Sequence, residues 1–117
     1  MSKQQETASL GEVIRAAREA KGIGLNAFAR DIGMSRTYLS RVETGQERNP
    51  PTEERLSAIA IALDLDADYL LHLAGRIPID VQAIVLGDPA LPAAIRLMGE
   101  MGVTGDEMAR WLGRRKA

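Results

Sequence analysis

The sequence predicts an all-α fold, and three observations support this prediction. Hydrophobic residues make up 45% of the chain but aromatic residues only 3%, so Leu, Ile, Val and Ala must build the core. Apolar residues recur at spacings of three and four, without the Val/Ile/Thr alternation that is typical of strands. Ser, Thr or Asp precedes several of these apolar runs, at the positions that favour helix N-caps. At 117 residues, the chain is expected to form one domain, or one small domain with an appendage.

The first predicted helix begins after Ser9. Ser9 and Glu12 have the spacing of a capping box, in which each side chain bonds the backbone of the other residue. The apolar residues that follow at helical spacing are Leu10, Val13, Ile14 and Ala17. The helix is predicted to run to about Lys21 and to stop at Gly22.

The second and third helices are predicted over residues 25–32 and 36–44, separated by a sharp turn. Gly33 can adopt the positive φ needed to leave one helix abruptly. Ser35 is a good N-cap for the next helix. The small Ala29 would let the two helices approach closely.

The third helix is predicted to have one apolar face and one polar face. Leu39 and Val42 repeat at helical spacing and can face a core. The residues left on the open side are Arg36, Thr37, Ser40 and Arg41. Such a face suits the major groove of DNA, where Arg pairs with guanine and Thr or Ser meets a base edge or phosphate. The alternative is an ordinary helix corner with a solvated polar face.

Two further helices are predicted after a stiff loop. Gly45 ends the third helix, and Pro50 and Pro51 then restrict the backbone of the loop. Thr52 is expected to cap a helix whose core stripe is Leu56, Ile59, Ala60 and Leu63. Asp66 is expected to cap a helix with Tyr69, Leu70 and Leu73 facing inward. His72 is interpreted as a surface residue.

About three short helices are predicted in the C-terminal residues. Helices are expected to begin after Pro78, near Pro89, and at a second capping box that starts at Thr104; residues 99–102 should break the middle one. The last helix carries Met108, Trp111 and Leu112 on one face. Helices this short are unstable alone, so they must pack on the core, on each other or on a partner. The basic residues 114–116 are interpreted as a solvated tail rather than a DNA-binding arm.

The run from Leu10 to about Gly75 resembles the helix-turn-helix domain of the lambda repressor and Cro family (Xre-like regulators). The first matching group comprises residues 15–22, Ala29, Gly33, Met34 and Ser35. The second comprises residues 38–43, Gly45, Pro51, Leu56, Ile59, Ala60, Ala62, Leu63 and residues 68–70. The resemblance covers somewhat more than half of the chain and implies a five-helix domain that binds double-stranded DNA.

The resemblance also implies roles for individual residues. It places the third helix in the major groove. Base contacts are expected from Arg36, Thr37 and Arg41, with Ser40 near a base or phosphate and Tyr38 either packing or touching the sugar-phosphate backbone. Arg48 and Asn49, in the loop, become candidate phosphate contacts, with a solvated loop as the alternative. Arg18 and Glu43 are expected to form a structural ion pair.

One position departs from the family pattern. Many relatives begin the second helix with a glutamine that binds phosphate, whereas this chain has Leu25. The neighbouring Asn26 is the candidate substitute, and one phosphate contact fewer is expected. Gly24 stands where relatives often have a Ser or Thr cap.

Composition restricts the class of protein. The net charge is −1, but residues 1–55 hold nine basic and eight acidic side chains, whereas residues 56–113 hold three and eight. The acidic excess therefore lies outside the predicted DNA-binding half. The chain has no Cys, which is compatible with a reducing cytoplasm, and no signal-peptide core or membrane-length apolar stretch was found. No catalytic set, metal-ligand spacing or phosphate loop indicates an enzyme, a cofactor or a metal.

The sequence thus predicts a flexible tail over residues 1–8, a helix-turn-helix domain over 9–75 and a helical extension over 76–117. The predicted function is a cytoplasmic, sequence-specific DNA-binding regulator, a repressor acting as a homodimer on a palindromic operator. The alternative is an antitoxin or adaptor whose C-terminal helices bind another protein. In either case Met108, Trp111 and Leu112 are the expected dimer or partner contacts.

Overall fold

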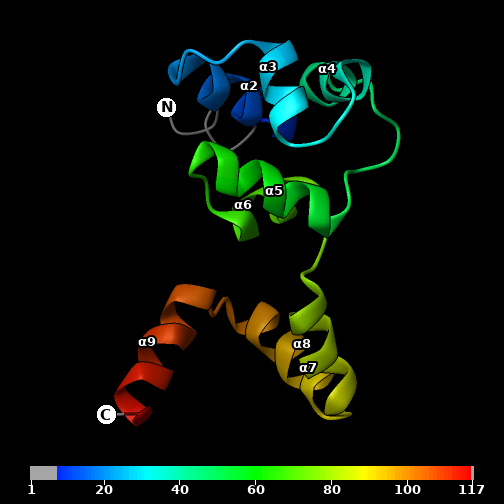
Figure 1. Cartoon of the computed structure of the whole chain (residues 1–117). Coiled ribbons are helices and arrows are strands. Elements are labelled where there is room, and N and C mark those ends of the chain that lie inside the picture. The colour runs from blue at the N-terminus through cyan, green and yellow to red at the C-terminus, as the bar shows by residue number, and fades with distance from the viewer. Residues whose placement is uncertain (1–7, 117) are drawn as a thin grey trace. The chain divides into compact units, whose positions relative to one another are not determined.

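Eight helices and no strand make up residues 8–116, which are the residues that the computed structural model describes (Figure 1). The first five are α2 (Leu10–Ala20), α3 (Leu25–Asp31), α4 (Arg36–Thr44), α5 (Glu53–Leu63) and α6 (Ala67–Leu73). The last three are α7 (Ile79–Gly87), α8 (Leu91–Met101) and α9 (Gly105–Lys116). The all-α prediction is confirmed. The tail predicted over residues 1–8 lies, apart from Ala8, outside the described residues.

The chain divides into two units, the first ending at Ile79 and the second beginning at Asp80. The first unit extends four residues beyond the boundary predicted at Gly75. The reason is a set of hydrogen bonds that attach this connecting segment to the start of α5. Arg76 donates to the carbonyl oxygens of Pro50 and Pro51, and the backbone N–H of Ile79 donates to Glu53 Oε1 at 2.8 Å.

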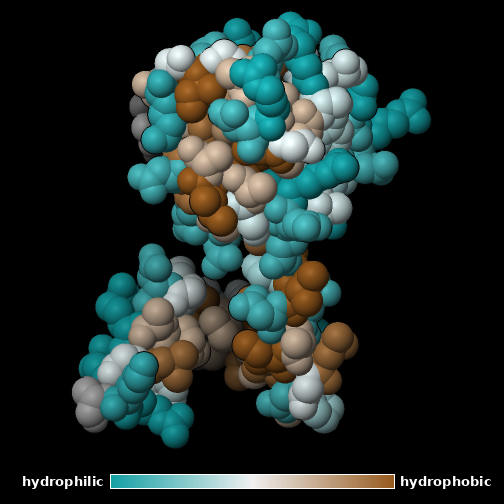
Figure 2. Space-filling view, in the orientation of Figure 1, coloured by the Kyte–Doolittle hydropathy of each residue, from teal (hydrophilic) through white to brown (hydrophobic). Residues whose placement is uncertain are grey.

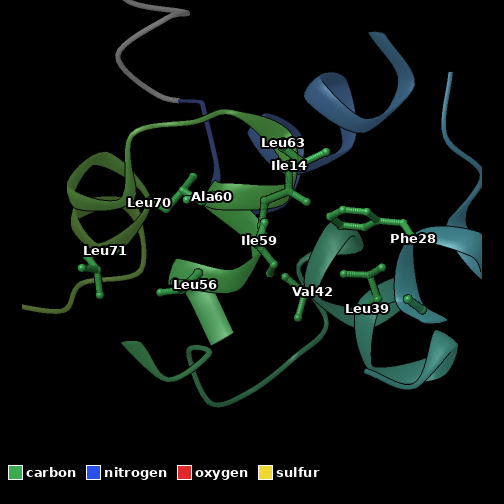
Figure 3. Close-up of a cluster of buried hydrophobic side chains, with 11 residues drawn as sticks. Ile14, Phe28, Leu39, Val42, Leu56, Ile59, Ala60, Leu63, Leu70 and Leu71 are labelled. Atoms are coloured by element: carbon green, nitrogen blue, oxygen red, sulfur yellow. The ribbon is translucent and has the colours of Figure 1, made fainter. Parts of the chain in front are cut away.

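The core of the first unit is formed by aliphatic side chains around a single phenylalanine (Figure 3). Phe28 of α3 is 1% exposed and lies beside the side chains of α4 and α5. The other buried hydrophobic residues are Ile14, Ala29, Leu39, Val42, Leu56, Ile59, Ala60, Leu63, Leu70 and Leu71. Every helix from α2 to α6 therefore contributes to one core, and α4 is held against it by its apolar face.

The predicted caps determine where these helices begin and end. The Ser9–Glu12 capping box is present, with both reciprocal hydrogen bonds at the start of α2. Ser35 and Thr52 accept backbone N–H groups at the starts of α4 and α5. Gly45 ends α4 with φ of 77°. These local interactions satisfy backbone groups that a helix end leaves without partners.

The buried face of α6 differs from the prediction. Tyr69 was expected to face inward but is 42% exposed, whereas Leu71 is 2% exposed. The contacts of α6 with the core follow positions Ala67, Leu70, Leu71 and Ala74, a regular i, i+3, i+4, i+7 stripe. That stripe places Tyr69 outside the core and leaves Leu73 half-buried at its edge.

The second unit contains α8 and α9 and almost all of α7, and none of these helices has a buried residue. Helix α8 ends within the predicted break at residues 99–102, but only at its last residue, Gly102, which has φ of 70°. One prediction was wrong here: the basic residues 114–116 form the last turn of α9 rather than a tail. Cations are favoured there because the carboxyl end of a helix carries partial negative charge.

No individual helix within residues 8–116 is long and apolar enough to cross a membrane. Helices α7 and α8 meet the length and composition requirement only jointly, and they are bent by 109° at the break between them. Across the same residues, no group of three or more His, Cys, Asp or Glu side chains could hold a metal ion.

Candidate nucleic-acid interface

The corner between α3 and α4 is built from backbone conformation and two local hydrogen bonds. Gly33 has φ of 70°, in the left-handed region that favours glycine. The N–H of Met34 donates to the carbonyl of Ala29 at 2.9 Å, which closes the turn. Ser35 Oγ then accepts the N–H of Tyr38 at 3.0 Å, which starts α4. The corner therefore has the geometry that the sequence predicts.

Helix α4 presents one face to the core and the opposite face to solvent. Leu39 is 0% and Val42 4% exposed, and both pack in the core of the first unit. On the other side, Arg36, Thr37 and Arg41 are exposed and Ser40 is half-buried. The result is an accessible helix surface with two guanidinium groups and two hydroxyl groups.

Arg18 of α2 and Glu43 of α4 form a buried, bidentate ion pair. Arg18 Nε donates to Glu43 Oε2 at 2.7 Å and Nη2 donates to Oε1 at 2.9 Å. Arg18 Nη1 donates to the carbonyl of Ile23 at 2.8 Å. The two side chains are 10% and 5% exposed. The hydrogen bond to Glu43 raises the pKa of Arg18, although burial opposes this shift. Glu43 is therefore engaged inside the protein and adds no free carboxylate to the exposed face of α4.

Gly11 allows the backbones of α2 and α4 to approach each other closely. A Cβ atom at Gly11 would lie 2.3 Å from the carbonyl oxygen of Glu43 and 2.4 Å from that of Val42. Both neighbours are backbone atoms, so neither can move without moving α4. The sequence pattern alone gives Gly11 no role of its own. A glycine in the first turn of a helix, where it lowers helix propensity, was the signal available for this contact.

Arg41 is paired with Glu47, an acid of the following loop whose role no sequence motif indicates. Its Nε donates to Glu47 Oε1 at 2.9 Å. The Arg41 side chain is 46% exposed and the Glu47 side chain 19% exposed. One of the predicted base-reading arginines is thus connected to the loop that follows α4.

The loop between α4 and α5 contains two exposed candidates for phosphate binding, Arg48 and Asn49. Its end is fixed because Pro51 is buried and both proline carbonyls accept from Arg76. The third candidate, Asn26, is exposed in the first turn of α3. Arg76 lies 25 residues from Pro51 in sequence, and no local pattern indicates its contact.

Tyr38 packs rather than standing free on the helix surface. It is half-buried against the core, and the guanidinium of Arg55 lies 4.5 Å from the centre of its ring. This distance is within the range of a cation–π contact. The backbone carbonyl of Ser40 accepts a hydrogen bond from Thr44 Oγ1 at 2.9 Å, whereas within residues 8–116 the Ser40 hydroxyl has no hydrogen-bond partner.

The second unit contains a groove of about 530 Å³ between α8 and α9. The groove is lined only by apolar residues, namely Leu91, Ala94, Leu97, Met98, Met101, Val103, Met108 and Leu112. Trp111 is not part of this lining; it is 48% exposed, with Arg115 5.6 Å from its ring centre. Figure 2 shows hydrophobic side chains exposed over the helices of this unit. Two of the three predicted contact residues, Met108 and Leu112, therefore share one apolar surface.

Comparison with known proteins identifies relatives of the first unit. Residues 14–70 match the Helix-turn-helix family. The ImmF control region 10 kDa protein of Bacillus phage phi105 is 43% identical over 61 residues, which are 52% of this chain and 66% of that protein. The HTH-type transcriptional repressor RghR of Bacillus subtilis (strain 168) is 35% identical over 69 residues, which are 59% of this chain and 50% of that protein. The chain thus spans between half and about two thirds of the length of these curated relatives.

A solved structure matches most of the chain. A chain of the SinR protein/SinI protein complex is similar with a TM-score of 0.50 and 25% sequence identity. The match covers 92% of this chain and 94% of that one. The family match agrees with the α3–α4 corner and the buried Arg18–Glu43 pair described above. The chain belongs, through residues 14–70, to the Xre-like helix-turn-helix family of the lambda repressor and Cro.

Proposed function

We propose that this protein is a sequence-specific, double-stranded-DNA-binding transcriptional regulator whose α4 reads the major groove. The observation that carries the proposal is the arrangement of α4. Its apolar face is buried, while Arg36, Thr37 and Arg41 share an exposed face directly after a glycine turn. The fixed turn and the bidentate Arg18–Glu43 pair hold this face in a defined position, which a recognition helix requires.

The exposed side chains fit the chemistry of base recognition. The major groove of B-DNA is about 12 Å wide and admits one α-helix. Arginine donates two hydrogen bonds to the N7 and O6 atoms of guanine, and threonine offers a hydroxyl and a methyl group. We assign base readout to Arg36, Thr37 and Arg41, with Ser40 contacting base or backbone. Tyr38 supports α4 from the side, under Arg55.

Backbone contacts are assigned to the elements on either side of α4. Arg48 and Asn49 lie in the loop whose end is fixed by Arg76, and Asn26 lies in the first turn of α3. Such contacts set the position and orientation of the protein on the duplex without reading sequence. The acidic excess of residues 56–113 favours an encounter through the first unit.

The working form in this proposal is a homodimer that associates through the groove of α8 and α9. One helix-turn-helix unit makes few contacts, whereas two units bound about 34 Å apart on one face of a duplex supply affinity and match a palindromic operator. The groove supports this assignment because it leaves Leu97, Met101 and Leu112 about half exposed or more. Burying them against a second copy would be favourable.

Repression is the proposed outcome of binding, and it is supported by the name of the relative RghR, a transcriptional repressor. A second function is favoured by one observation: the similar solved chain belongs to a complex of two proteins, SinR and SinI. The same apolar groove could then receive a different protein, as in an antitoxin or an adaptor.

Selection of bound fragments from random duplex DNA tests the proposal. The full chain should enrich a sequence with two inverted half-sites about one helical turn apart. Arg36→Ala should abolish the enrichment, whereas Arg96→Ala, which changes an exposed arginine of α8, should retain it. If no sequence is enriched by the full chain, the DNA-binding proposal is wrong.

A further inference from the structure

We propose that Glu47 is a positioning residue that holds Arg41 in place to recognise a guanine. The inference rests on the proposed function and deepens it, because it names what orients one of the base-reading side chains. In this account Glu47 touches no base itself. It acts through the guanidinium group of Arg41.

The geometry of the pair is fixed by main-chain contacts as well as by the side chains. Arg41 Nε donates to Glu47 Oε1 at 2.9 Å. The carbonyl of Arg41 accepts the N–H of Gln46 at 2.8 Å and that of Glu47 at 3.2 Å. The backbone that carries the carboxylate is thus bonded to the residue whose side chain it holds. Ordering this pair therefore costs less conformational entropy than ordering two free side chains.

The contact leaves the recognition edge of Arg41 available. Only Nε donates to Glu47, and within residues 8–116 neither terminal nitrogen of Arg41 has a hydrogen-bond partner. These two nitrogens can donate together to the N7 and O6 atoms of one guanine. An arginine without such support must lose the freedom of its long side chain when it binds, whereas this one is already oriented.

A second surface ion pair of the first unit provides a comparison for the Arg41–Glu47 pair. Arg15 and Glu19 form an i, i+4 pair at 3.1 Å on α2, with side chains 60% and 56% exposed. Exposed ion pairs of that kind contribute little to the free energy of folding. Glu47, in contrast, is only 19% exposed and belongs to the loop that also carries Arg48 and Asn49. Glu19→Gln is therefore a matched control, since it removes the same charge from an exposed pair on another helix.

Removing the Glu47 carboxylate should affect two kinds of DNA differently. Removing the carboxylate removes a negative charge from the binding surface, so affinity for unrelated DNA should rise or stay level. Affinity for the cognate site should fall, because Arg41 is no longer held in position. Loss of general attraction or of folding would not produce this pair of effects.

The experiment measures binding of the full chain to the selected cognate duplex, to its single-base variants and to a random duplex. The proteins are wild type, Glu47→Gln, Glu19→Gln, Arg41→Ala and the double variant Arg41→Ala/Glu47→Gln. The base pair read by Arg41 is the one at which substitution lowers the affinity of wild type but not that of Arg41→Ala. Glu47→Gln should reduce discrimination at that base pair by about threefold to tenfold, and should add nothing in the Arg41→Ala background.

Each result supports or overturns the inference. Glu47→Gln behaving like Glu19→Gln, or lowering affinity equally when Arg41 is absent, would overturn it. Tighter cognate binding by Glu47→Gln would also overturn it, because Glu47 would then restrain Arg41 rather than position it. If wild type selects no duplex, the proposed function fails and this inference fails with it; wild-type selectivity with an unchanged Glu47→Gln would contradict the inference alone.

Discussion

At the scale of single residues, α4 is positioned by the Arg18–Glu43 ion pair and by Gly11, which has no side chain to separate α2 from α4. Arg18 reaches Glu43 through two hydrogen bonds and Ile23 through a third, so each guanidinium nitrogen and each carboxylate oxygen of the pair has a partner. Gly11 brings the backbone of α2 against that of α4 at the same helix crossing. Both features act through α4, because each sets how that helix lies on the core.

Replacing Glu43 by alanine should reduce both stability and DNA affinity. Removal of one partner of a buried pair costs about 3–5 kcal/mol, because the other charge is left buried without compensation. Thermal unfolding and duplex binding measure the two effects. Because the pKa of Arg18 is raised, its contribution to stability is complete below the ordinary arginine pKa and is lost only as the pH rises through the raised value. Assays at neutral pH therefore measure the full effect, and unchanged melting with lost binding would instead assign Glu43 a direct role on DNA.

Replacing Gly11 by alanine should destabilise the first unit although alanine is the better helix former. The helix propensity gain is about 1 kcal/mol, but forcing a Cβ against two backbone carbonyls should outweigh it, for a net loss of about 1–3 kcal/mol. Gly24→Ser is the control, since Gly24 has open space around it and caps α3 without a side-chain bond. It should gain a few tenths of a kcal/mol in the free energy of unfolding, about the usual difference between Ser and Gly at an N-cap. Equal stability of Gly11→Ala and wild type would contradict the tight helix crossing.

At the scale of elements, the sequence predicts what is local. The ends of α2, α4 and α5 follow from side chains within a few residues of the cap, and the turn at Gly33 follows from one backbone preference. The inward face of α6 was not predictable in the same way, because in a seven-residue helix two neighbouring apolar stripes fit the pattern equally well. Only packing on α5 selects Leu71 over Tyr69.

The contacts that complete the candidate interface are long-range or cross a loop. Arg76 meets Pro50 and Pro51 across about 25 residues of sequence, and Arg55 meets Tyr38 between two helices. No periodicity encodes such pairs. The readout residues of α4 and the Arg18–Glu43 pair could be proposed from the sequence, the pair through the family resemblance, whereas the contacts of Gly11, Glu47 and Arg76 required the structure.

Arg76→Lys should loosen the loop between α4 and α5. Lysine keeps the charge but cannot reproduce the planar fork with which arginine bonds two adjacent carbonyls. Backbone amides of residues 46–49 should exchange faster with solvent deuterium, and DNA affinity should fall about equally for all sequences. Arg96→Lys in α8 should change neither quantity. Unchanged exchange in Arg76→Lys would show that the prolines alone fix the loop.

At the scale of the whole molecule, the chain combines a unit with a complete core and a unit whose helices have no buried residue. The first has the parts of a DNA reader. The second exposes apolar side chains that a partner could cover, including those around Met108 and Leu112. The second unit is therefore expected to carry self-association.

A chain ending at Ile79 should fold and sediment as a monomer, whereas the full chain should sediment as a dimer. In the full chain, Leu112→Asp should break the dimer, because it places a charge in the apolar groove. Ile61→Asp is the control, since Ile61 is 83% exposed and belongs to the first unit. Trp111→Ala tests whether the exposed tryptophan extends the contact. A dimer that persists without residues 80–117 would place the interface in the first unit.

In the proposed complex, α4 reads bases while the following loop contacts the DNA backbone, and two arginines distinguish these roles. Arg36 lies in the first turn of α4, and Arg48 lies in the proline-restricted loop. Binding of Arg36→Ala and Arg48→Ala is measured on cognate and random duplexes over a range of salt concentrations. Arg36→Ala should cost about 1–3 kcal/mol on the cognate site and much less on random DNA. Arg48→Ala should weaken binding to both duplexes by similar factors. It should also lower the slope of log affinity against log salt by about one unit per half-site. Equal losses for both variants on both duplexes would contradict the account, because α4 would then not be the reading element.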